Sequence, residues 1–200
     1  MEIIVHRRNS LSELNATPQR FGVEVDVRSH GDTLIIHHDP FVPGESFEAW
    51  LSTYRHGTLI LNVKEEGLEP RLIDLMRRAG FENYFFLDQS FPFLLKYAAL
   101  ASGRSAVRVS EYESVQTALS VAGKVQWAWV DCFARFPLSA NQAAELQEAG
   151  LKLCIVSPEL QGRSAEVEIP RLASMLEEMN ICPDAVCTKR SDLWEALVCR

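Results

Sequence analysis

The stretch LILNVKEEGLEPRLIDLMRRAGFENYFFL, residues 59–87, contains a complete strand–helix–strand unit. Its two ends, Leu59–Val63 and Tyr84–Leu87, are short apolar runs with β-branched or aromatic side chains, which predict buried strands. The apolar residues between them lie on one face of a helix: Leu68, Leu72, Leu75, Met76 and Ala79. Gly80 predicts the end of that helix, because glycine adopts the left-handed closing conformation without a steric penalty. The unit therefore predicts two parallel strands joined by a right-handed helical crossover.

The same unit recurs along the chain. Eight apolar runs alternate with stretches of helical periodicity, at residues 3–5, 21–27, 59–63, 84–87, 106–109, 125–130, 151–156 and 184–187. Ser10, Ser110 and Ser139 are each followed three residues later by Glu or Gln, the capping-box pattern of a helix start. No G-x-G-x-x-G motif follows the first strand, which argues against an open dinucleotide-binding sheet. Eight units predict the α/β class and a compact, closed (β/α)8 barrel of the TIM type.

The length limits how such a barrel is built. Two hundred residues divided among eight units leave about 25 residues for each, at the lower end of the size range of these barrels. Some helices are therefore expected to be short or missing, first of all within residues 41–57, which contain Pro43 and Gly44. Because no linker interrupts the pattern, we predict a single domain over residues 1–200.

The composition excludes several functions. With 27 acidic and 20 basic residues the chain has a net charge of −7, and its hydrophobic fraction of 47% is that of an ordinary globular protein. This charge argues against nucleic-acid binding, which needs clustered Lys and Arg. No stretch is long and apolar enough for a membrane span, and the first residues enter a strand directly, so a cytoplasmic location is expected. Most of the five cysteines are predicted to be small buried side chains in a reducing compartment: Cys132, Cys154, Cys182, Cys187 and Cys199.

In a barrel of this type the chemistry lies at the carboxyl ends of the strands. Glu24 and Asp26 point to the same side of one strand, because residues two apart share a face. Two ionised carboxylates at a barrel mouth need a cation or basic side chains to offset their repulsion and lost hydration, and oxygen ligands favour Mg²⁺ or Ca²⁺. From these two residues alone, a half-exposed strand with both acids in water is equally open.

Imidazole and basic groups occupy comparable positions. His6 and Arg7 end the first strand, and Lys64 follows the third. A predicted strand from Leu34 alternates its side chains as far as His38, for which a metal ligand, a general acid and a turn-capping residue all stay open. Two histidines near paired acids and a strand-borne lysine suit phosphoryl chemistry, with cations on the phosphate oxygens and imidazoles moving protons. The lysine also leaves open an aldolase or other lyase that forms a Schiff base.

These residues occur in the order of a known family. His6-Arg7, the segment Gly22-Val-Glu-Val-Asp26, a strand reaching His38-Asp39 and a third strand ending in Val-Lys64 resemble the glycerophosphodiester phosphodiesterases. This family belongs to the wider group of phosphatidylinositol-phospholipase-C-like phosphodiesterases. Segments 88–91 and 183–193 are similar to the family's fourth and last strand ends, so the resemblance spans essentially the whole chain.

The resemblance implies three pairs of site residues. His6 and His38 are the acid and base, Arg7 and Lys64 bind the phosphate, and Glu24 and Asp26 are metal ligands. The implied cofactor is a divalent cation, Mg²⁺ or Ca²⁺, and the implied partner is a small-molecule phosphodiester. A neighbouring substrate hydroxyl, such as the 2-hydroxyl of glycerol, attacks phosphorus and expels an alcohol. Water then opens the cyclic phosphate, and the two histidines move the protons.

The sequence departs from the family pattern at two positions. Asn62 stands where the family usually has a third metal-binding carboxylate, and a neutral amide oxygen binds a hard cation more weakly. Asp131 or Asp88 from other strands, or Glu65 from the adjacent loop, are candidates to replace it. Arg8 stands where the family generally has glycine, which argues against an identical substrate. The alternative function is a barrel that binds a phosphate ester or headgroup without hydrolysing it.

Two further segments bear on the substrate. Residues 41–57 are too short for the inserted subdomain that covers the site in many relatives, so a more open mouth and a larger diester are expected. Gln161 and Arg163 follow the seventh predicted strand, where they either reach a phosphate or belong to a solvated loop.

Overall fold

A computed structural model describes residues 1–198 of the chain. These residues divide into two compact units. The amino-terminal unit is His6–Ser105, and the carboxy-terminal unit combines Met1–Val5 with residues 106–198. The single domain expected from the sequence stays a prediction. Among the helices described, none is long and apolar enough to cross a membrane.

The amino-terminal unit contains a five-stranded sheet with the order β4-β3-β2-β5-β6. Its strands are β2 (Gly22–His30), β3 (Thr33–Ile36), β4 (Glu45–Ser46), β5 (Leu59–Val63) and β6 (Tyr84–Leu87). β2, β5 and β6 pair in parallel, whereas β3 is antiparallel to β2 and β4 is antiparallel to β3. The parallel pairing predicted from the strand–helix–strand stretch is confirmed, and the short β4 is an addition to the predicted pattern.

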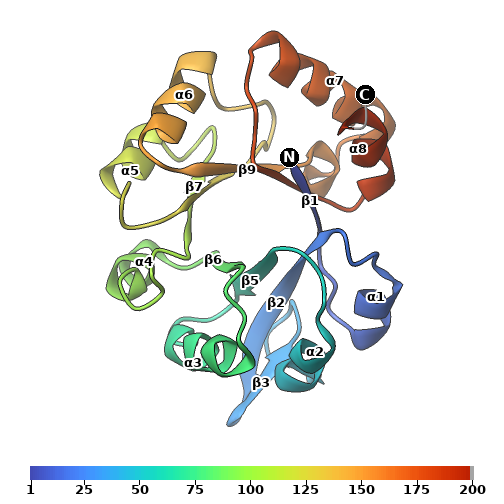
Figure 1. The fold of residues 1–200 in the computed structure, drawn as a ribbon, viewed down its shortest axis with the longest axis vertical. Helices are drawn as coiled ribbons and strands as arrows, with labels where there is room; N and C mark the ends of the chain where they lie inside the picture. Colours follow the sequence, from blue (N-terminus) through green and yellow to red (C-terminus); the bar gives the residue numbers. More distant parts are fainter. Residues whose placement is uncertain (199–200) are drawn as a thin grey trace. The chain divides into compact units, whose positions relative to one another are not determined.

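The helices of this unit are α1 (Leu11–Ala16), α2 (Phe47–Thr53), α3 (Glu69–Ala79) and α4 (Phe91–Tyr97). As predicted, α3 ends at Gly80, which has a left-handed φ of 71°. The shortening predicted within residues 41–57 is also confirmed, because α2 has only seven residues. α2 and α3 pack against the sheet and bury their apolar faces in one core with β2 and β5 (Figure 1).

Aromatic side chains of α2 and of the residue that ends it form a cluster in the core. Trp50 is fully buried and its ring lies 6.0 Å from that of Phe47 and 5.4 Å from that of Tyr54. The indole Nε1 of Trp50 donates a hydrogen bond of 3.0 Å to the carbonyl oxygen of Arg8. The Arg8 N–H donates in turn to the carbonyl oxygen of Glu24 at 2.9 Å. The segment that follows β1 (Glu2–Val5) is therefore fixed both to α2 and to β2.

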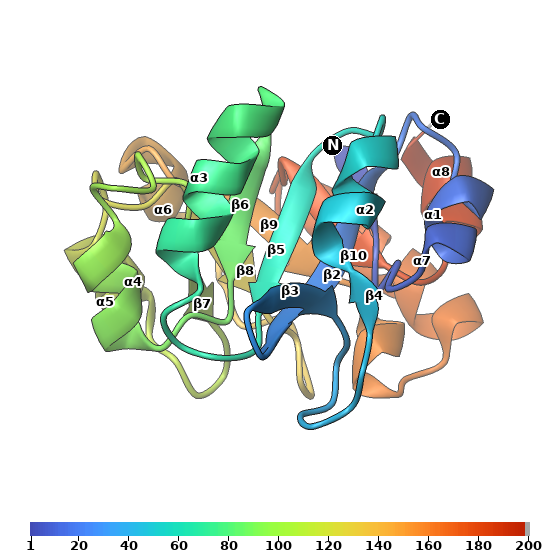
Figure 2. The same ribbon diagram turned by 90° about the horizontal axis from the view of Figure 1, so that it is seen from below.

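The strand that was expected to reach His38 ends two residues earlier, at Ile36. The His37 N–H still donates to the carbonyl oxygen of Asp26 at 3.2 Å, but the chain then turns into a loop of residues 37–44. Gly44 ends this loop in a place where a Cβ would lie 2.2 Å from the carbonyl oxygen of Ile36, so only glycine fits. In Figure 2 the loop lies on the side toward which the arrowheads of β5 and β6 point.

The carboxy-terminal unit has a parallel sheet with the order β1-β10-β9-β8-β7. The further strands are β7 (Ala106–Val109), β8 (Trp127–Val130), β9 (Lys152–Val156) and β10 (Ala185–Thr188). The helices are α5 (Val115–Ser120), α6 (Ala140–Glu148), the 3₁₀ helix η1 (Pro158–Gln161), α7 (Ala165–Glu178) and α8 (Ser191–Val198). In Figure 1, α5 to α8 all lie on one face of this sheet. Across the two units, all eight predicted strands are therefore present.

One predicted helix start is wrong. The Ser110 hydroxyl accepts hydrogen bonds from the N–H groups of Tyr112 and Glu113, but it closes a turn and no helix begins there. α5 begins four residues later, because the Ser114 hydroxyl caps it by accepting from the Thr117 N–H. The other two predicted starts are confirmed, with a complete capping box at Ser139.

The segment that follows β8 is held by Glu111. Its carboxylate accepts hydrogen bonds from the backbone N–H groups of Phe133, Ala134 and Arg135, at 3.2, 2.7 and 2.7 Å. Burial alone would raise the pKa of Glu111, but these hydrogen bonds outweigh it, and the pKa lies below its ordinary value of 4.5. The charged carboxylate therefore stabilises the folded state.

We expect Glu111→Gln to lower the free energy of unfolding at neutral pH by about 1 kcal/mol, because charge-assisted hydrogen bonds become neutral ones. A group whose pKa is lowered by folding stabilises above its unfolded pKa and loses that contribution as the pH falls through its folded pKa. The difference between variant and parent should therefore be full at neutral pH and shrink below 4.5. Urea unfolding across this range measures it, and a pH-independent difference would contradict the assignment.

The cysteines largely follow the prediction. Cys132, Cys154 and Cys187 are buried, whereas Cys182 is exposed and Cys199 lies outside the described residues. Burial raises the pKa of the Cys132 thiol to about 12, with a smaller contribution from the neighbouring Asp131 carboxylate. Burial also raises the pKa of Cys154 well above its ordinary value.

These environments predict selective alkylation. At pH near 8, iodoacetamide should modify Cys182 rapidly and leave Cys132 and Cys154 unmodified in the folded protein, because only thiolates react. Peptide mass spectrometry of the digested protein reads each site separately. Alkylation in urea, where every cysteine becomes accessible, is the control, and rapid labelling of Cys132 without urea would contradict the burial.

Candidate functional site

The amino-terminal unit gathers six of the predicted residues around the middle of β2 and the carboxyl end of β5: His6, Arg7, Glu24, Asp26, Asn62 and Lys64. The parallel register explains the grouping, because the pairing of β2 with β5 ends at Val27 and Val63, so the middle of the longer β2 lies beside the carboxyl end of β5. Asp26 and Asn62 are register partners on these strands. Both carboxylates are fully buried, so the half-exposed strand with acids in water is excluded.

Glu24 lies at the centre of this cluster. Its Oε1 accepts a hydrogen bond of 2.8 Å from the Asn62 side-chain amide, and its Oε2 accepts one of 2.7 Å from the Arg7 backbone N–H. The Nε2 atom of His6 lies 3.7 Å from Oε2. Burial and then the nearby Asp26 carboxylate raise the pKa of Glu24 to about 7, because the hydrogen bonds offset these two effects only in part.

Asp26 accepts a side-chain hydrogen bond on one carboxylate oxygen and has an ion-pair partner near each of the two. Its Oδ2 accepts a hydrogen bond of 2.7 Å from the side-chain amide of Asn9 and lies 3.4 Å from the Nε atom of Arg7. Its Oδ1 lies 3.3 Å from Lys64 Nζ. Asn9 also accepts a hydrogen bond of 3.0 Å from the Asp26 backbone N–H. Sequence reasoning missed Asn9, because nothing in its local pattern shows that this loop residue reaches β2.

Lys64 is shared between two acids. Its Nζ lies 3.2 Å from the carboxylate of Asp88, which follows β6, as well as close to Asp26. Asp88 and Arg7 both have left-handed φ values, 59° and 51°, which are uncommon for residues with a Cβ. Glu65, another candidate metal ligand, instead accepts a hydrogen bond of 3.1 Å from the Ser29 backbone N–H.

His38 lies on the loop after β3, with 43% of its side chain exposed. Its Nδ1 hydrogen bonds to the Asp39 carboxylate at 2.8 Å, and this bond holds the pKa of Asp39 below its usual range. The guanidinium of Arg28 donates to the His38 carbonyl oxygen at 3.0 and 2.9 Å and to that of Lys64 at 3.1 Å. Arg28 therefore ties the histidine loop to the end of β5. In the sequence, the only indication that Arg28 belongs to the site is its position two residues after Asp26.

The donor set at β2 and β5 fits a divalent cation. Within the described part of the chain, the buried Oδ1 atoms of Asp26 and Asn62 accept no hydrogen bond, and the two residues are register partners. Carboxylate and amide oxygens are the ligands that Mg²⁺ and Ca²⁺ prefer. However, the described residues contain no cluster of three His, Cys, Asp or Glu side chains suited to a metal. The set is therefore one carboxylate short, as the asparagine at position 62 suggests.

The remaining predicted residues have other partners. Asp131, at the end of β8 in the carboxy-terminal unit, accepts hydrogen bonds of 2.7 Å from Arg108 and from Gln161. Its role as an additional metal ligand stays a prediction. Arg163, for which a phosphate contact or a solvated loop was open, instead donates to the backbone carbonyl oxygens of Cys132 and Ala134.

Comparison with known proteins identifies the class of fold. No family model and no curated protein sequence matches the chain. Solved structures do match over nearly its whole length, and they are α/β barrels of the type that includes the glycerophosphodiester phosphodiesterases. The fold class predicted from the sequence, and the family resemblance at the level of the fold, are thereby confirmed.

Two of the similar structures carry that family name. A glycerophosphodiester phosphodiesterase from Agrobacterium tumefaciens has a TM-score of 0.72 and 14% identity, and the match covers 98% of this chain and 99% of that one. A glycerophosphoryl diester phosphodiesterase from Parabacteroides distasonis has a TM-score of 0.67 and 15% identity, with 94% and 82% covered. A tryptophan synthase α-subunit from Pyrococcus furiosus also matches, with a TM-score of 0.61, 10% identity, and 94% and 86% covered. Because one fold appears under different names, the function must be argued from the site.

Proposed function

We propose that this protein hydrolyses a phosphodiester of the glycerophosphodiester type. One observation carries the proposal: imidazole, guanidinium, ammonium and two buried carboxylates converge near the place where the parallel pairing of β2 with β5 ends. This is the part of an α/β barrel where substrates bind. The cations can neutralise phosphate oxygens, and the imidazole can move a proton.

In this proposal Arg7 and Lys64 bind the non-bridging phosphate oxygens. His6 accepts the proton of a neighbouring substrate hydroxyl as its oxygen bonds to phosphorus, and His38 protonates the alcohol whose P–O bond breaks. The two histidines then exchange roles while water opens the cyclic phosphate to a monoester. Asp39 suits His38 to this task, because a carboxylate on Nδ1 fixes the tautomer and leaves Nε2 for proton transfer.

Glu24, Asp26 and Asn62 would hold the divalent cation. A bound cation supplies charge stabilisation to the phosphoryl oxygens without transferring a proton. The Asn62 amide meanwhile donates to Glu24, so its Oδ1 atom is directed away from that carboxylate and is available to a cation. Asn9 holds Asp26 in place through the other carboxylate oxygen, Oδ2, and so leaves Oδ1 for the cation.

A cavity beside Lys64 has room for part of a substrate. It has a volume of about 200 Å³ and is lined by Val63, Lys64, Glu65, Glu66, Glu69, Asp88, Gln89 and Ser90. Its walls come from the ends of β5 and β6, next to the proposed phosphate-binding lysine. Seven of the eight lining residues are polar, and their carboxylate and amide oxygens can accept hydrogen bonds from the hydroxyl groups of a small-molecule substrate.

The direct test is turnover of diesters. Purified protein should release alcohol and phosphomonoester from glycerophosphodiesters or a chromogenic phosphodiester, and removal of divalent ions by a chelator should lower the rate. Replacement of His38 by alanine should abolish release, with the exposed His30 replaced as the matched control. No turnover on a broad diester panel with each of Mg²⁺, Ca²⁺ and Mn²⁺ would refute the proposal.

A binding module is the second candidate function, and one contact favours it. The Asn62 side-chain amide donates a hydrogen bond to Glu24, at the position where a third carboxylate would be a metal ligand. Titration calorimetry separates the two functions. A binding module gives heat that saturates as the phosphate ester is added, whereas an enzyme gives continuing heat because it hydrolyses the ester.

We expect Asn62→Glu to tighten Mg²⁺ or Mn²⁺ binding by about tenfold or more, because it adds the third carboxylate that a hard cation requires. Calorimetry with the ion alone measures this effect independently of turnover. Asn62→Gln, which keeps a neutral amide, is the control and should not tighten binding. Unchanged ion affinity in the glutamate variant would contradict a metal site at this position.

A further inference from the structure

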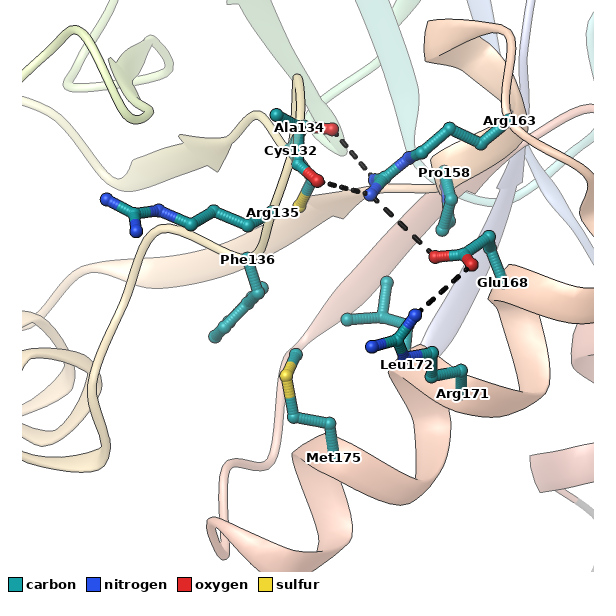
Figure 3. A pocket seen from close by; sticks show the side chains of 10 residues that line it. All are labelled: Cys132, Ala134, Arg135, Phe136, Pro158, Arg163, Glu168, Arg171, Leu172 and Met175. Atoms are coloured by element: carbon teal, nitrogen blue, oxygen red, sulfur yellow. Dashed lines mark hydrogen bonds and ion pairs between the residues drawn. The ribbon is translucent and has the colours of Figure 1, made fainter.

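A second cavity lies in the carboxy-terminal unit, between the segment that follows β8 and the middle of α7 (Figure 3). Its volume is about 150 Å³. It is lined by Cys132, Ala134, Arg135, Phe136, Pro158, Arg163, Glu168, Arg171, Leu172 and Met175. The proposed hydrolysis uses none of these residues, so the cavity needs an account of its own.

The loop wall of this cavity is fixed before any ligand binds. The Arg163 guanidinium donates to the carbonyl oxygens of Cys132 and Ala134 at 2.8 and 3.1 Å. Glu111 holds the same segment from the other side through its backbone N–H groups. Because these backbone carbonyl and N–H groups are already hydrogen-bonded, a ligand does not lose binding free energy by ordering this segment.

One part of the cavity is apolar. In Figure 3, Met175 and Leu172 extend from α7, and Phe136 extends from the loop on the side that faces Met175. Pro158, at the start of η1, contributes another apolar surface. A cavity of this volume accommodates one six-membered ring, since dry cavities of about 150 Å³ in other proteins take up benzene. Methionine and phenylalanine are suitable neighbours for such a ring.

The other part is cationic. Without Arg135, the lining has two arginines and one glutamate, a formal charge of +1, although the whole chain carries −7. Glu168 lies between them, 3.9 Å from Arg163 and 3.6 Å from Arg171. Arg171 is 78% exposed, and its guanidinium lies 3.6 Å from Glu168, beyond hydrogen-bond distance. Its side chain points toward the cavity, whereas that of Arg135 points away (Figure 3). The N–H groups of Arg171 can therefore turn to a ligand. Within the described part of the chain, the buried Nε atom of Arg163 also lacks a hydrogen-bond partner.

We propose that this cavity binds a small amphiphilic anion, with one six-membered ring between Phe136 and Met175 and its carboxylate on Arg171. The planar fork of a guanidinium matches a carboxylate with two parallel hydrogen bonds. The apolar lining excludes strongly hydrated anions, and the arginine favours an anion over a neutral ring. The site is independent of the proposed hydrolysis, so either can fail without the other.

Benzoate is the probe of choice. A ligand of this size should bind with a Kd of about 1 mM, given the affinity that each non-hydrogen atom contributes in small ligands. The methyl signal of Met175 in ¹³C-methyl-methionine NMR should shift saturably with benzoate. The signal of Met76, buried in the amino-terminal unit, is the internal control and should stay unchanged. Benzyl alcohol, which lacks the charge, and acetate, which lacks the ring, should each bind at least about fivefold more weakly.

Arg77 provides a matched control variant. Like Arg171, it is 78% exposed and forms an ion pair with an acidic residue three positions earlier on a helix. Arg171→Gln should weaken benzoate binding at least about fivefold, whereas Arg77→Gln should leave it unchanged. Phe136→Ala should weaken it as well, through the apolar wall. The proposal is overturned if the Met175 signal does not shift, or still changes linearly with concentration at about 20 mM benzoate. It is also overturned if acetate or benzyl alcohol binds as tightly as benzoate, or if Arg171→Gln and Arg77→Gln have equal effects.

Discussion

Replacement of His6 by alanine should lower kcat for phosphodiester hydrolysis by about 10²- to 10⁴-fold, the contribution typical of a positioned general acid or base. His6 lies 3.7 Å from the fully buried Glu24, and 15% of its side chain is exposed, so substrate can reach it. The loss should appear mainly in kcat, because the variant retains Arg7 and Lys64, the residues proposed to bind the phosphate. Added imidazole should restore part of the activity, since the variant leaves a space of the same shape.

The control for this prediction is His30→Ala, because His30 is exposed at the end of β2, away from the carboxylates. Its activity should equal that of the parent protein. Thermal unfolding and circular dichroism of both variants test whether the fold is retained. A His6→Ala protein that folds and keeps its activity within about threefold of the parent would remove His6 from the mechanism.

Replacement of Trp50 by alanine should lower the free energy of unfolding of the amino-terminal unit by about 3–5 kcal/mol. The indole is fully buried between Phe47 and Tyr54, so truncation leaves a cavity as well as a lost hydrogen bond to Arg8. A loss of this size is a large part of the 5–15 kcal/mol that stabilises a typical domain. Urea unfolding followed by circular dichroism measures it.

Two variants divide the Trp50 effect into its parts. Trp50→Phe keeps most of the buried ring but removes the donor to the Arg8 carbonyl, so a smaller loss of about 1–3 kcal/mol is expected. Phe41→Ala removes an aromatic side chain that is 99% exposed and should change stability by less than about 0.5 kcal/mol. A Trp50→Ala loss no larger than that of Phe41→Ala would contradict the packing described.

The sequence was sufficient for the regular part of the fold. Leu59–Val63 and Tyr84–Leu87 are buried parallel strands because their apolar runs match strand length, and α3 ends at Gly80 because its periodicity stops there. The helix start at Ser110 was misplaced, since a capping pattern shows only that a hydroxyl can accept two N–H groups. Whether a helix follows depends on the next residues, and here Ser114 provides the cap.

The candidate site was predicted in outline but not in its supporting contacts. Glu24 and Asp26 were recognisable because a strand places residues two apart on one face, and their burial is consistent with that reading. Asn9 and Arg28 were missed because their importance depends on tertiary contacts, with Asp26 and with two backbone carbonyls respectively. A polar residue in a loop carries no periodic signal that shows which strand it will reach.

Arg28 determines how the loop that carries His38 can move. One planar guanidinium binds the carbonyl oxygens of both His38 and Lys64, so the loop cannot swing as a separate lid without breaking charge-assisted hydrogen bonds. If these hydrogen bonds stay intact, the loop can move only together with the end of β5. The geometry therefore favours a fixed platform that a substrate approaches, rather than a gate that opens and closes during each turnover. On such a platform, the distance between the His38 loop and the end of β5 at Lys64 is set when the chain folds and not when a ligand arrives.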